Sequence, residues 1–375
     1  MRKYLSTTLC FFLCFNAFSQ EQLMDSIIQK NYSTFSTLVD KESFKGQGWD
    51  LLLKETNAAN SVVVGEMHFT NEVPYFINAL IGQVKFDNYF QEIDPYSNRI
   101  LEQNIKSLSP DKLNLFVHDF NSTFSFLERK NDFKLYEKMV KQGIHTFGLE
   151  QVFLESDRLL LSDLQKNTKN KDTYAILSEM IKTSKELSLN EDIYLFTEDF
   201  LEKSTLLLKS KLSVEEREYL EAMKVSREIY LGGNHHLRIQ VMKNILLKEI
   251  ANWSNKKNLF KFGAVHTPKG ESLMEIYDIG NLVSSIEDAN FRNSLHIMLI
   301  GKSAGETEED LKLYKSFLGV VTTDEWHCFD LRPLQKAIST SNLKIEDQTL
   351  LRIIKGNDYL IYIPHLTESE KFSTK

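Results

Sequence analysis

Cysteine is scarce in this chain, and no long apolar or long basic run follows its first residues. Of three cysteines in 375 residues, Cys10 and Cys14 lie near the start and only Cys328 lies further along. A single thiol cannot build the disulfide framework of a small exported domain, so we expect the fold to depend on a large apolar core. The net charge of −7 argues against nucleic acid as a partner. We also expect no transmembrane segment after the first residues.

The N-terminal residues have the pattern of a secretory signal peptide. Arg2 and Lys3 provide positive charge, residues 9–15 are apolar, and Ala17-Phe18-Ser19 forms a small-x-small cleavage site before Gln20. The alternative is a membrane anchor, but the apolar stretch is too short to cross a bilayer. We therefore predict that residues 1–19 are a signal peptide. The mature protein would be periplasmic or extracellular.

Several familiar catalytic motifs are missing. The sequence contains no His-Glu-x-x-His, phosphate-binding loop, Gly-x-Ser-x-Gly or Cys-x-x-Cys motif. This weighs against the familiar zinc proteases, nucleotide-dependent enzymes and serine hydrolases. A site assembled from separate strands remains open.

Four apolar runs each end in an acid or a histidine. They are residues 62–68, 89–94, 146–150 and 260–266, and they close with Glu66 and His68, Glu92 and Asp94, Glu150, and His266, respectively. Ligand sites of open α/β sheets lie at the carboxyl ends of the strands. If the runs are parallel strands, these side chains meet at one edge of a sheet.

The arrangement of elements predicts an α/β fold with a mainly parallel sheet flanked by helices. We expect strands at 61–67, 87–93, 144–149, 259–265, 295–300, 326–331 and 359–363, helices at 71–83 and 96–106, and helix and loop over 20–54. Residues 155–250 contain no proline and are rich in Leu, Glu, Lys and Ser, which indicates a helical insert that caps the site. Gly232-Gly233-Asn234 should mark a sharp bend. We predict one α/β domain over residues 20–375.

The strand-end residues could do acid–base chemistry or bind a metal. Glu66 and His68 are two apart and point to the same side of a strand, so the carboxylate could orient the imidazole as a general base, or both could ligate a divalent ion. The alternative is that both are ordinary polar residues where a strand leads into a loop. Glu92 and Asp94 repeat the spacing, and could instead form a solvated acidic loop.

His266 and the adjacent pair His235 and His236 are the other histidines considered for a functional role. His266 follows an apolar run into a Pro/Gly turn, which favours a functional role over a structural one. His235 and His236 could bind metal or haem, or could simply be solvated.

Short motifs in the same order resemble the erythromycin esterase-like and haem-uptake ChaN-like proteins, which share a fold with the TIKI metalloproteases. They are Gly65-Glu66-Met67-His68 with Glu72, the strand-end Glu92, Arg238-x-x-x-Met242-x-Asn244, Val265-His266, and Gly280-x-Leu282. The resemblance covers residues 60–301.

This resemblance implies that the chain, exported by its predicted signal peptide, would be a hydrolase of an ester, lactone or amide bond. Its catalytic centre would be Glu66, His68, Glu92 and His266, which would also be the ligands if a metal is present. Glu72, Asp94, Glu150, Arg238, Asn244 and Lys269 are the expected substrate-binding or supporting residues. The alternatives are a ChaN-like protein that binds haem or a small ligand without catalysis, and a TIKI-like metal-dependent peptidase. The partner would be a small-molecule or peptide substrate, and the cofactor, if any, a divalent ion or haem.

Overall fold

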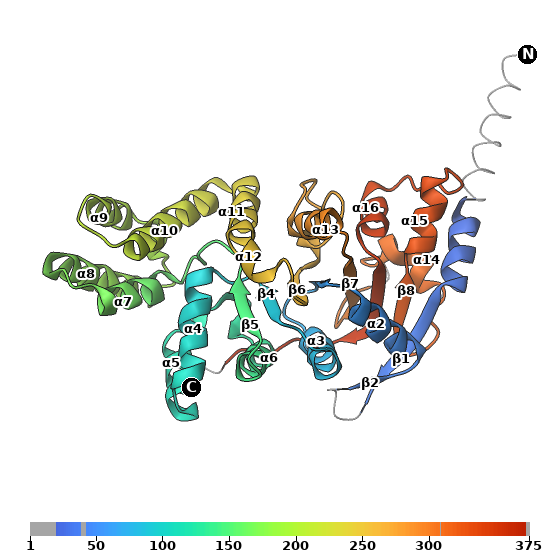
Figure 1. The fold of residues 1–375 in the computed structure, drawn as a ribbon, viewed down its shortest axis with the longest axis horizontal. Coiled ribbons are helices and arrows are strands. Elements are labelled where there is room, and N and C mark those ends of the chain that lie inside the picture. The colour runs from blue at the N-terminus through green and yellow to red at the C-terminus, as the bar shows by residue number, and fades with distance from the viewer. Residues whose placement is uncertain (1–19, 39–42, 308, 373–375) are drawn as a thin grey trace, which may run out of the picture. The chain divides into compact units, whose positions relative to one another are not determined.

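The computed structural model describes residues 20–38, 43–307 and 309–372. The predicted signal peptide lies outside these residues. The chain divides into two compact units (Figure 1). Unit 1 holds the chain up to Lys85 and from Phe262 to Glu368, and unit 2 holds Phe86–Lys261 and the segment from Ser369.

Unit 1 contains six strands in the order β2-β1-β8-β9-β7-β3. Their bounds are β1 Tyr32–Thr37, β2 Phe44–Lys45, β3 Ser61–Glu66, β7 Ser294–Ser303, β8 Trp326–Asp330 and β9 Tyr359–Leu366. The pairs β3–β7 and β7–β9 are parallel. The pairs β1–β2, β1–β8 and β8–β9 are antiparallel.

The prediction of a mainly parallel sheet is therefore too simple, because the sheet is mixed. The difference begins in residues 20–54, which were expected to form only helix and loop. Residues 20–30 are helical, but β1 and β2 follow them and add an antiparallel edge. In β1 the side chain of Phe35 is fully buried while Tyr32 is exposed, so this strand lacks the continuous apolar run that identified the predicted strands.

Helices cover the strands of unit 1. They are α2 Gln47–Ala58, α3 Glu72–Gln83, α13 Ile279–Ala289, α14 Lys315–Leu318, α15 Arg332–Ser339 and α16 Gln348–Gly356, with 3-10 turns η4 Ala264–His266 and η5 Lys312–Tyr314. The core includes an aromatic cluster in which Phe44 lies 4.9 Å, between ring centroids, from both Trp49 and Trp326. Large buried rings of this kind provide much of the apolar burial on which the fold depends.

Unit 2 contains three parallel strands in the order β6-β4-β5. They are β4 Asn88–Gln91, β5 His145–Gly148 and β6 Asn258–Gly263, whose last two residues belong to unit 1. Phe90 in the middle strand stacks on Phe147 and Phe260 at centroid distances of 4.7 and 4.3 Å. This aromatic stack fixes the register of the three strands, since each ring comes from a paired position.

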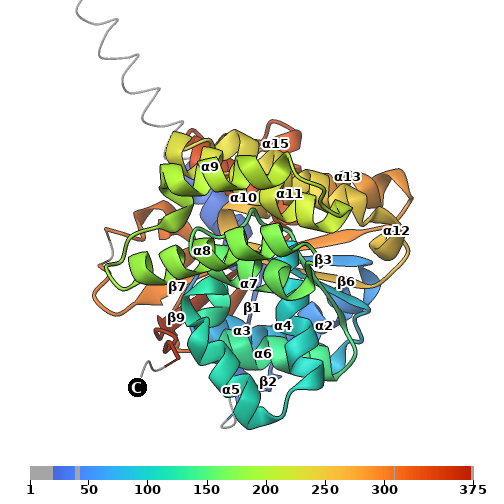
Figure 2. The same cartoon turned by 90° about the vertical axis from the view of Figure 1, so that its left-hand side faces the viewer.

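The helices of unit 2 include the predicted insert. They are α4 Pro95–Ser107, α5 Pro110–Asp119, α6 Lys130–Lys141, α7 Asp157–Asn167, α8 Lys171–Ser188, α9 Glu198–Leu208, α10 Val214–Gly232, α11 His235–Lys248 and α12 Ile250–Trp253, with 3-10 turns η1 Asn121–Thr123, η2 Ser125–Glu128 and η3 Tyr194–Phe196. Residues 155–250 are helical as expected, and α7–α10 pack together (Figures 1 and 2). The capping role of this insert stays a prediction. Within the described ranges, no helix is long and apolar enough to cross a membrane.

Two local predictions have different outcomes. The bend at Gly232-Gly233-Asn234 is confirmed, because α10 ends at Gly232 and Gly233 adopts the left-handed conformation with φ +57°. The strand expected to run to residue 265 instead ends at Gly263, and η4 carries His266. The Thr267 hydroxyl donates to the Ala264 carbonyl at 3.1 Å, which closes this turn and ends the extended backbone.

Candidate functional site

Glu66 and His68 form a hydrogen-bonded pair at the carboxyl end of β3. The whole strand is buried, and its last residue places the carboxylate 3.0 Å from His68 Nδ1. An ionised carboxylate can only accept, so Nδ1 carries the proton and Nε2 is the basic nitrogen of the neutral ring. The predicted contact between these two residues is confirmed. The site assignment itself stays a prediction.

A strained turn follows this pair. Phe69 has φ +66° and is 43% exposed, and the Thr70 hydroxyl closes the turn by donating to the Met67 carbonyl at 3.0 Å. Bulky residues rarely occupy the left-handed region, and such strain clusters at functional sites. The Phe69 ring lies 6.0 Å from the His68 ring, between centroids.

His266 has a carboxylate partner that the sequence did not suggest. Its Nδ1 lies 2.8 Å from Asp278 Oδ2, and both side chains are almost fully buried. The ring atom that faces the carboxylate is Nδ1, as in the Glu66–His68 pair. A signal was present, because an Asp directly before the apolar run of α13 is a helix N-cap pattern.

The segment that carries His266 packs against the end of β3. A Cβ at Gly65 would lie 2.4 Å from Thr267 Oγ1 and 3.0 Å from Ala264 Cα, and a Cβ at Gly280 would lie 2.0 Å from the Thr267 carbonyl oxygen. Only glycine fits at either position. The two histidine–carboxylate pairs of unit 1 therefore belong to adjacent backbone segments.

His296 also holds this turn in place. Its Nδ1 donates to the Thr267 carbonyl at 2.7 Å. Burial, with a smaller contribution from the charge of Lys269, lowers the pKa of His296 to about 4. The ring is therefore neutral at physiological pH and serves as a structural hydrogen-bond donor.

Two expected supporting residues have structural contacts in unit 1. Glu72, the first residue of α3, accepts from the backbone nitrogen of Thr367 at 2.9 Å and from its hydroxyl at 2.7 Å. Lys269 donates to Asp358 at 2.7 Å. These contacts connect the residues at the two ends of β9 to α3 and to the segment after η4.

In unit 2, Arg238 of α11 joins the carboxylates that follow β4 and β5. Its Nη2 lies 3.2 Å from Glu92 Oε1, and its Nε lies 3.0 Å from Glu150 Oε1. Burial alone would lower the pKa of Arg238, but the hydrogen bonds and charges of Glu150 and Glu92 outweigh it and raise the pKa. Three predicted site residues thus meet at the carboxyl ends of the strands of unit 2, as the strand-end argument requires.

The remaining two predicted residues of unit 2 differ in environment. Asp94 caps α4 by accepting from the backbone nitrogens of Tyr96 and Ser97 at 3.0 and 2.8 Å. Burial raises its pKa to about 6 although these hydrogen bonds oppose the change. Asn244 lies exposed on α11.

A pocket of about 330 Å³ in unit 2 lies beside Arg238 and Glu150. Its lining includes Glu150 and Arg238, the aromatic side chains of Phe126, Phe153 and Tyr230, and His235 at the start of α11. Apolar walls with a few convergent polar groups are typical of small-molecule sites. Burial is the main reason that the pKa of Tyr230 is raised to about 12, so its hydroxyl is a hydrogen-bond donor rather than an anion.

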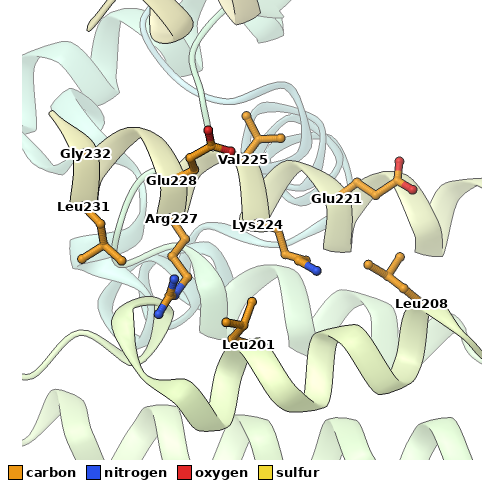
Figure 3. Close-up of a pocket in the computed structure, with 9 residues that line it drawn as sticks. All are labelled: Leu201, Leu208, Glu221, Lys224, Val225, Arg227, Glu228, Leu231 and Gly232. Carbon is orange, nitrogen blue, oxygen red and sulfur yellow. The ribbon is translucent and has the colours of Figure 1, made fainter. Parts of the chain in front are cut away.

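A larger hollow, of about 960 Å³, lies between α9 and α10 (Figure 3). Leu201 and Leu208 come from α9, and the charged residues Glu221, Lys224, Arg227 and Glu228 come from α10. None of the predicted site residues lines this hollow.

The four proposed catalytic residues are divided between the units. Glu66, His68 and His266 belong to unit 1, and Glu92 belongs to unit 2. The convergence of all four stays a prediction.

The two imidazoles of unit 1 offer nitrogen atoms of the kind that Zn²⁺ binds. In both pairs Nδ1 is engaged by a carboxylate, so Nε2 would be the ligating atom. Metal-binding histidines commonly have their second nitrogen held by a carboxylate in this way.

The fold is shared with known structures at low sequence identity. A histidine-to-asparagine mutant of the erythromycin esterase EreC, in its open conformation, aligns with a TM-score of 0.58 at 12% identity, over 90% of this chain and 98% of the esterase. A succinoglycan biosynthesis protein aligns with a TM-score of 0.55 at 14% identity, over 94% of this chain and 99% of that one. ChaN of Campylobacter jejuni, described with cofacial haem, covers 88% of this chain and 96% of its own at 14% identity, but its TM-score is 0.34. No protein-family model matches the chain, and no curated protein is significantly similar to it.

The alignment with EreC confirms the predicted resemblance to the erythromycin esterase-like proteins at the level of the fold. The chain has an erythromycin esterase-like fold, shared with EreC over nearly its whole described length. EreC and the succinoglycan biosynthesis protein carry different functional descriptions, and one fold can host many activities, so the function must be argued from the side chains.

Proposed function

We propose that this protein is an exported hydrolase that cleaves an ester, lactone or amide bond, with His68 or His266 as the general base. The observation that carries the proposal is the pair of histidine–carboxylate contacts, Glu66–His68 and Asp278–His266, on adjacent segments of unit 1. A carboxylate that holds Nδ1–H leaves Nε2 as the atom that can take a proton from water.

The proposed reaction uses these residues in a fixed order. Nε2 of the base accepts a proton from a water molecule, and the hydroxide equivalent attacks the carbonyl carbon of the substrate. The partner carboxylate stabilises the imidazolium that forms. The imidazolium then returns the proton to the leaving alcohol or amine as the carbonyl–heteroatom bond breaks.

In unit 2, the predicted substrate-binding residues Arg238 and Glu150 belong to this proposal. The guanidinium of Arg238, ordered by Glu92 and Glu150, is a candidate for binding a polar group of the substrate. The adjoining pocket, with Phe126, Phe153 and Tyr230 in its lining, would hold an apolar part. The capping role of the helical insert belongs to the same proposal.

A metal-dependent variant of this function is the second candidate. The arrangement of both histidines supports it, because a carboxylate holds Nδ1 in each case and would direct Nε2 to an ion. A bound divalent ion would polarise the carbonyl or activate the water. Haem or small-ligand binding without catalysis is not better supported by any contact described above.

The test compares His68→Asn and His266→Asn with the unchanged protein on a panel of esters, lactones and peptides. An Asn amide lies near the position of Nδ1 and can still donate to Glu66 or Asp278, so it removes Nε2 while preserving the hydrogen bond. A general acid–base group contributes about 10²- to 10⁴-fold in rate. We expect a loss of that size in kcat for the residue that acts as the base, and a smaller loss for the other.

His365→Asn is the matched control, because His365 is an exposed histidine of the same unit. It should keep full activity. If both site variants stay folded and fully active, the acid–base assignment fails. Chelation followed by restoration with Zn²⁺ separates the metal-dependent variant from the metal-free one, and a Soret band on adding haem would favour ligand binding.

A further inference from the structure

We propose that Asp278 is a positioning residue that fixes the tautomer and orientation of His266. The consequence for catalysis rests on the hydrolase function proposed above, but the positioning itself is a property of unit 1. Asp278 would do for His266 what Glu66 does for His68, so that the two histidines present the same basic nitrogen.

The two carboxylate oxygens of Asp278 have different partners. Oδ1 accepts from the backbone nitrogen of Ile279 at 2.6 Å, and Oδ2 faces His266 Nδ1 at 2.8 Å. A carboxylate at full burial has to be paired to be stable, and the imidazole N–H is the donor that Oδ2 faces. His266 must therefore carry its proton on Nδ1.

The backbone next to His266 is also held in place. Gly65 and Gly280 approach Thr267 so closely that a Cβ at either position would lie 2.4 or 2.0 Å from a Thr267 oxygen. His296 donates to the same Thr267 carbonyl at 2.7 Å. Thr267, the residue after His266, is thus held by contacts with β3, α13 and β7. Asp278 adds the contact that sets the rotation of the His266 ring.

The competing explanation is that Asp278 only caps α13. The cap contact uses Oδ1 alone, and Asn serves as an N-cap about as well as Asp. Asp278→Asn therefore keeps the cap and removes the charge that holds Nδ1–H. This separates positioning from capping.

The first measurement needs only the unchanged protein. With the histidine rings labelled with ¹⁵N, long-range ¹H–¹⁵N correlation spectra report which ring nitrogen is protonated, and the His266→Asn variant identifies the His266 signals. We expect His266 to be protonated on Nδ1 when neutral. A His266 ring protonated on Nε2 would overturn the proposal, whether or not any Asp278 variant folds.

The second measurement uses Asp278→Asn, with Asp347→Asn as the control. Asp347 caps α16 in the same unit, and its carboxylate accepts from the backbone nitrogen of Leu350 at 2.9 Å. Asp278→Asn should shift the His266 ring toward the Nε2–H tautomer and lower kcat by about 10²- to 10⁴-fold with little change in KM. Asp347→Asn should change neither.

The possible results separate this proposal from the proposed function. If the tautomer changes but no substrate is hydrolysed even by the unchanged protein, the positioning role stands and the hydrolase proposal fails. If Asp278→Asn keeps the original tautomer and the full rate, Asp278 is only a cap and the positioning proposal is overturned.

Discussion

Buried carboxylates in this protein differ in how fully they are hydrogen-bonded. Glu66 and Asp278 each face a histidine Nδ1, whereas Asp94 uses only one oxygen. Its Oδ1 accepts from two backbone nitrogens, but its Oδ2 has no hydrogen-bond partner among the residues that the structure describes. That isolation is the physical reason that burial raises the pKa of Asp94 to about 6.

Asp94 should make the folded state less stable as the pH rises. The raised pKa means that Asp94 binds a proton in the folded state between its ordinary pKa of 3.8 and about 6, where the unfolded chain has already lost it. The free energy of unfolding therefore falls as pH rises through this window. We predict that Asp94→Asn, which keeps the cap, gains stability relative to the unchanged protein by up to about 3 kcal/mol between pH 4 and pH 7. Urea unfolding at each pH measures the difference.

A second variant that keeps an N-cap side chain but cannot titrate tests whether the Asp94 carboxyl causes the change of stability with pH. Asp94→Ser should show the same change with pH as Asp94→Asn, since both remove the titration and keep an N-cap side chain. A stability difference that does not vary with pH would mean that Asp94 is ionised in the folded protein.

At the level of elements, the apolar runs predicted strands reliably, including β5 at one end of the sheet. The strands β3, β4, β5, β6, β7, β8 and β9 were found near their predicted positions. The strand β1 was missed because Phe35 is its one buried residue. Periodicity could not indicate antiparallel pairing, which depends on contacts far apart in sequence.

The site was predictable to a similar extent. The contact of Glu66 with His68 agrees with the pairing considered from their spacing, although His68 lies in the turn after β3. Glu92 and Glu150 were expected at strand ends and Arg238 was expected from the family resemblance, but the contact of Arg238 with the two carboxylates was not predicted. Asp278 was missed because it lies beyond a loop from His266 and meets it only through the way α13 packs against Thr267.

The junction of α10 and α11 offers a paired test of backbone conformation. Gly233 has φ +57° and nothing near its missing Cβ, while Gly232 is the last residue of α10 and is also unobstructed. We predict that Gly233→Ala lowers the free energy of unfolding by about 1 kcal/mol, because a side chain disfavours the left-handed region. Gly232→Ala should instead raise it by about 0.5 kcal/mol, since Ala is the better helix former. Urea unfolding of both variants decides, and equal effects would contradict the assigned conformation.

At the level of the whole molecule, the predicted signal peptide concerns where the protein works. Arg2 and Lys3, the apolar residues 9–15 and the Ala17-Phe18-Ser19 site lead us to predict cleavage before Gln20. Mass spectrometry of the protein from its native host should find Gln20 at the mature N-terminus. An intact Met1 would refute export by this route.

The split of unit 1 across the chain has a consequence for biosynthesis. Ser61 of β3 pairs with Ser294 of β7, and the whole of Phe86–Lys261 lies between them in sequence. A ribosome therefore releases β3 long before its partner exists, and closing so long a loop is slow. In the meantime the apolar β3 and α3 must be shielded from aggregation. Unit 2 is almost continuous in sequence and can begin to fold first, so the His266–Asp278 pair and the packing of its segment on β3 form only when the last third of the chain has emerged.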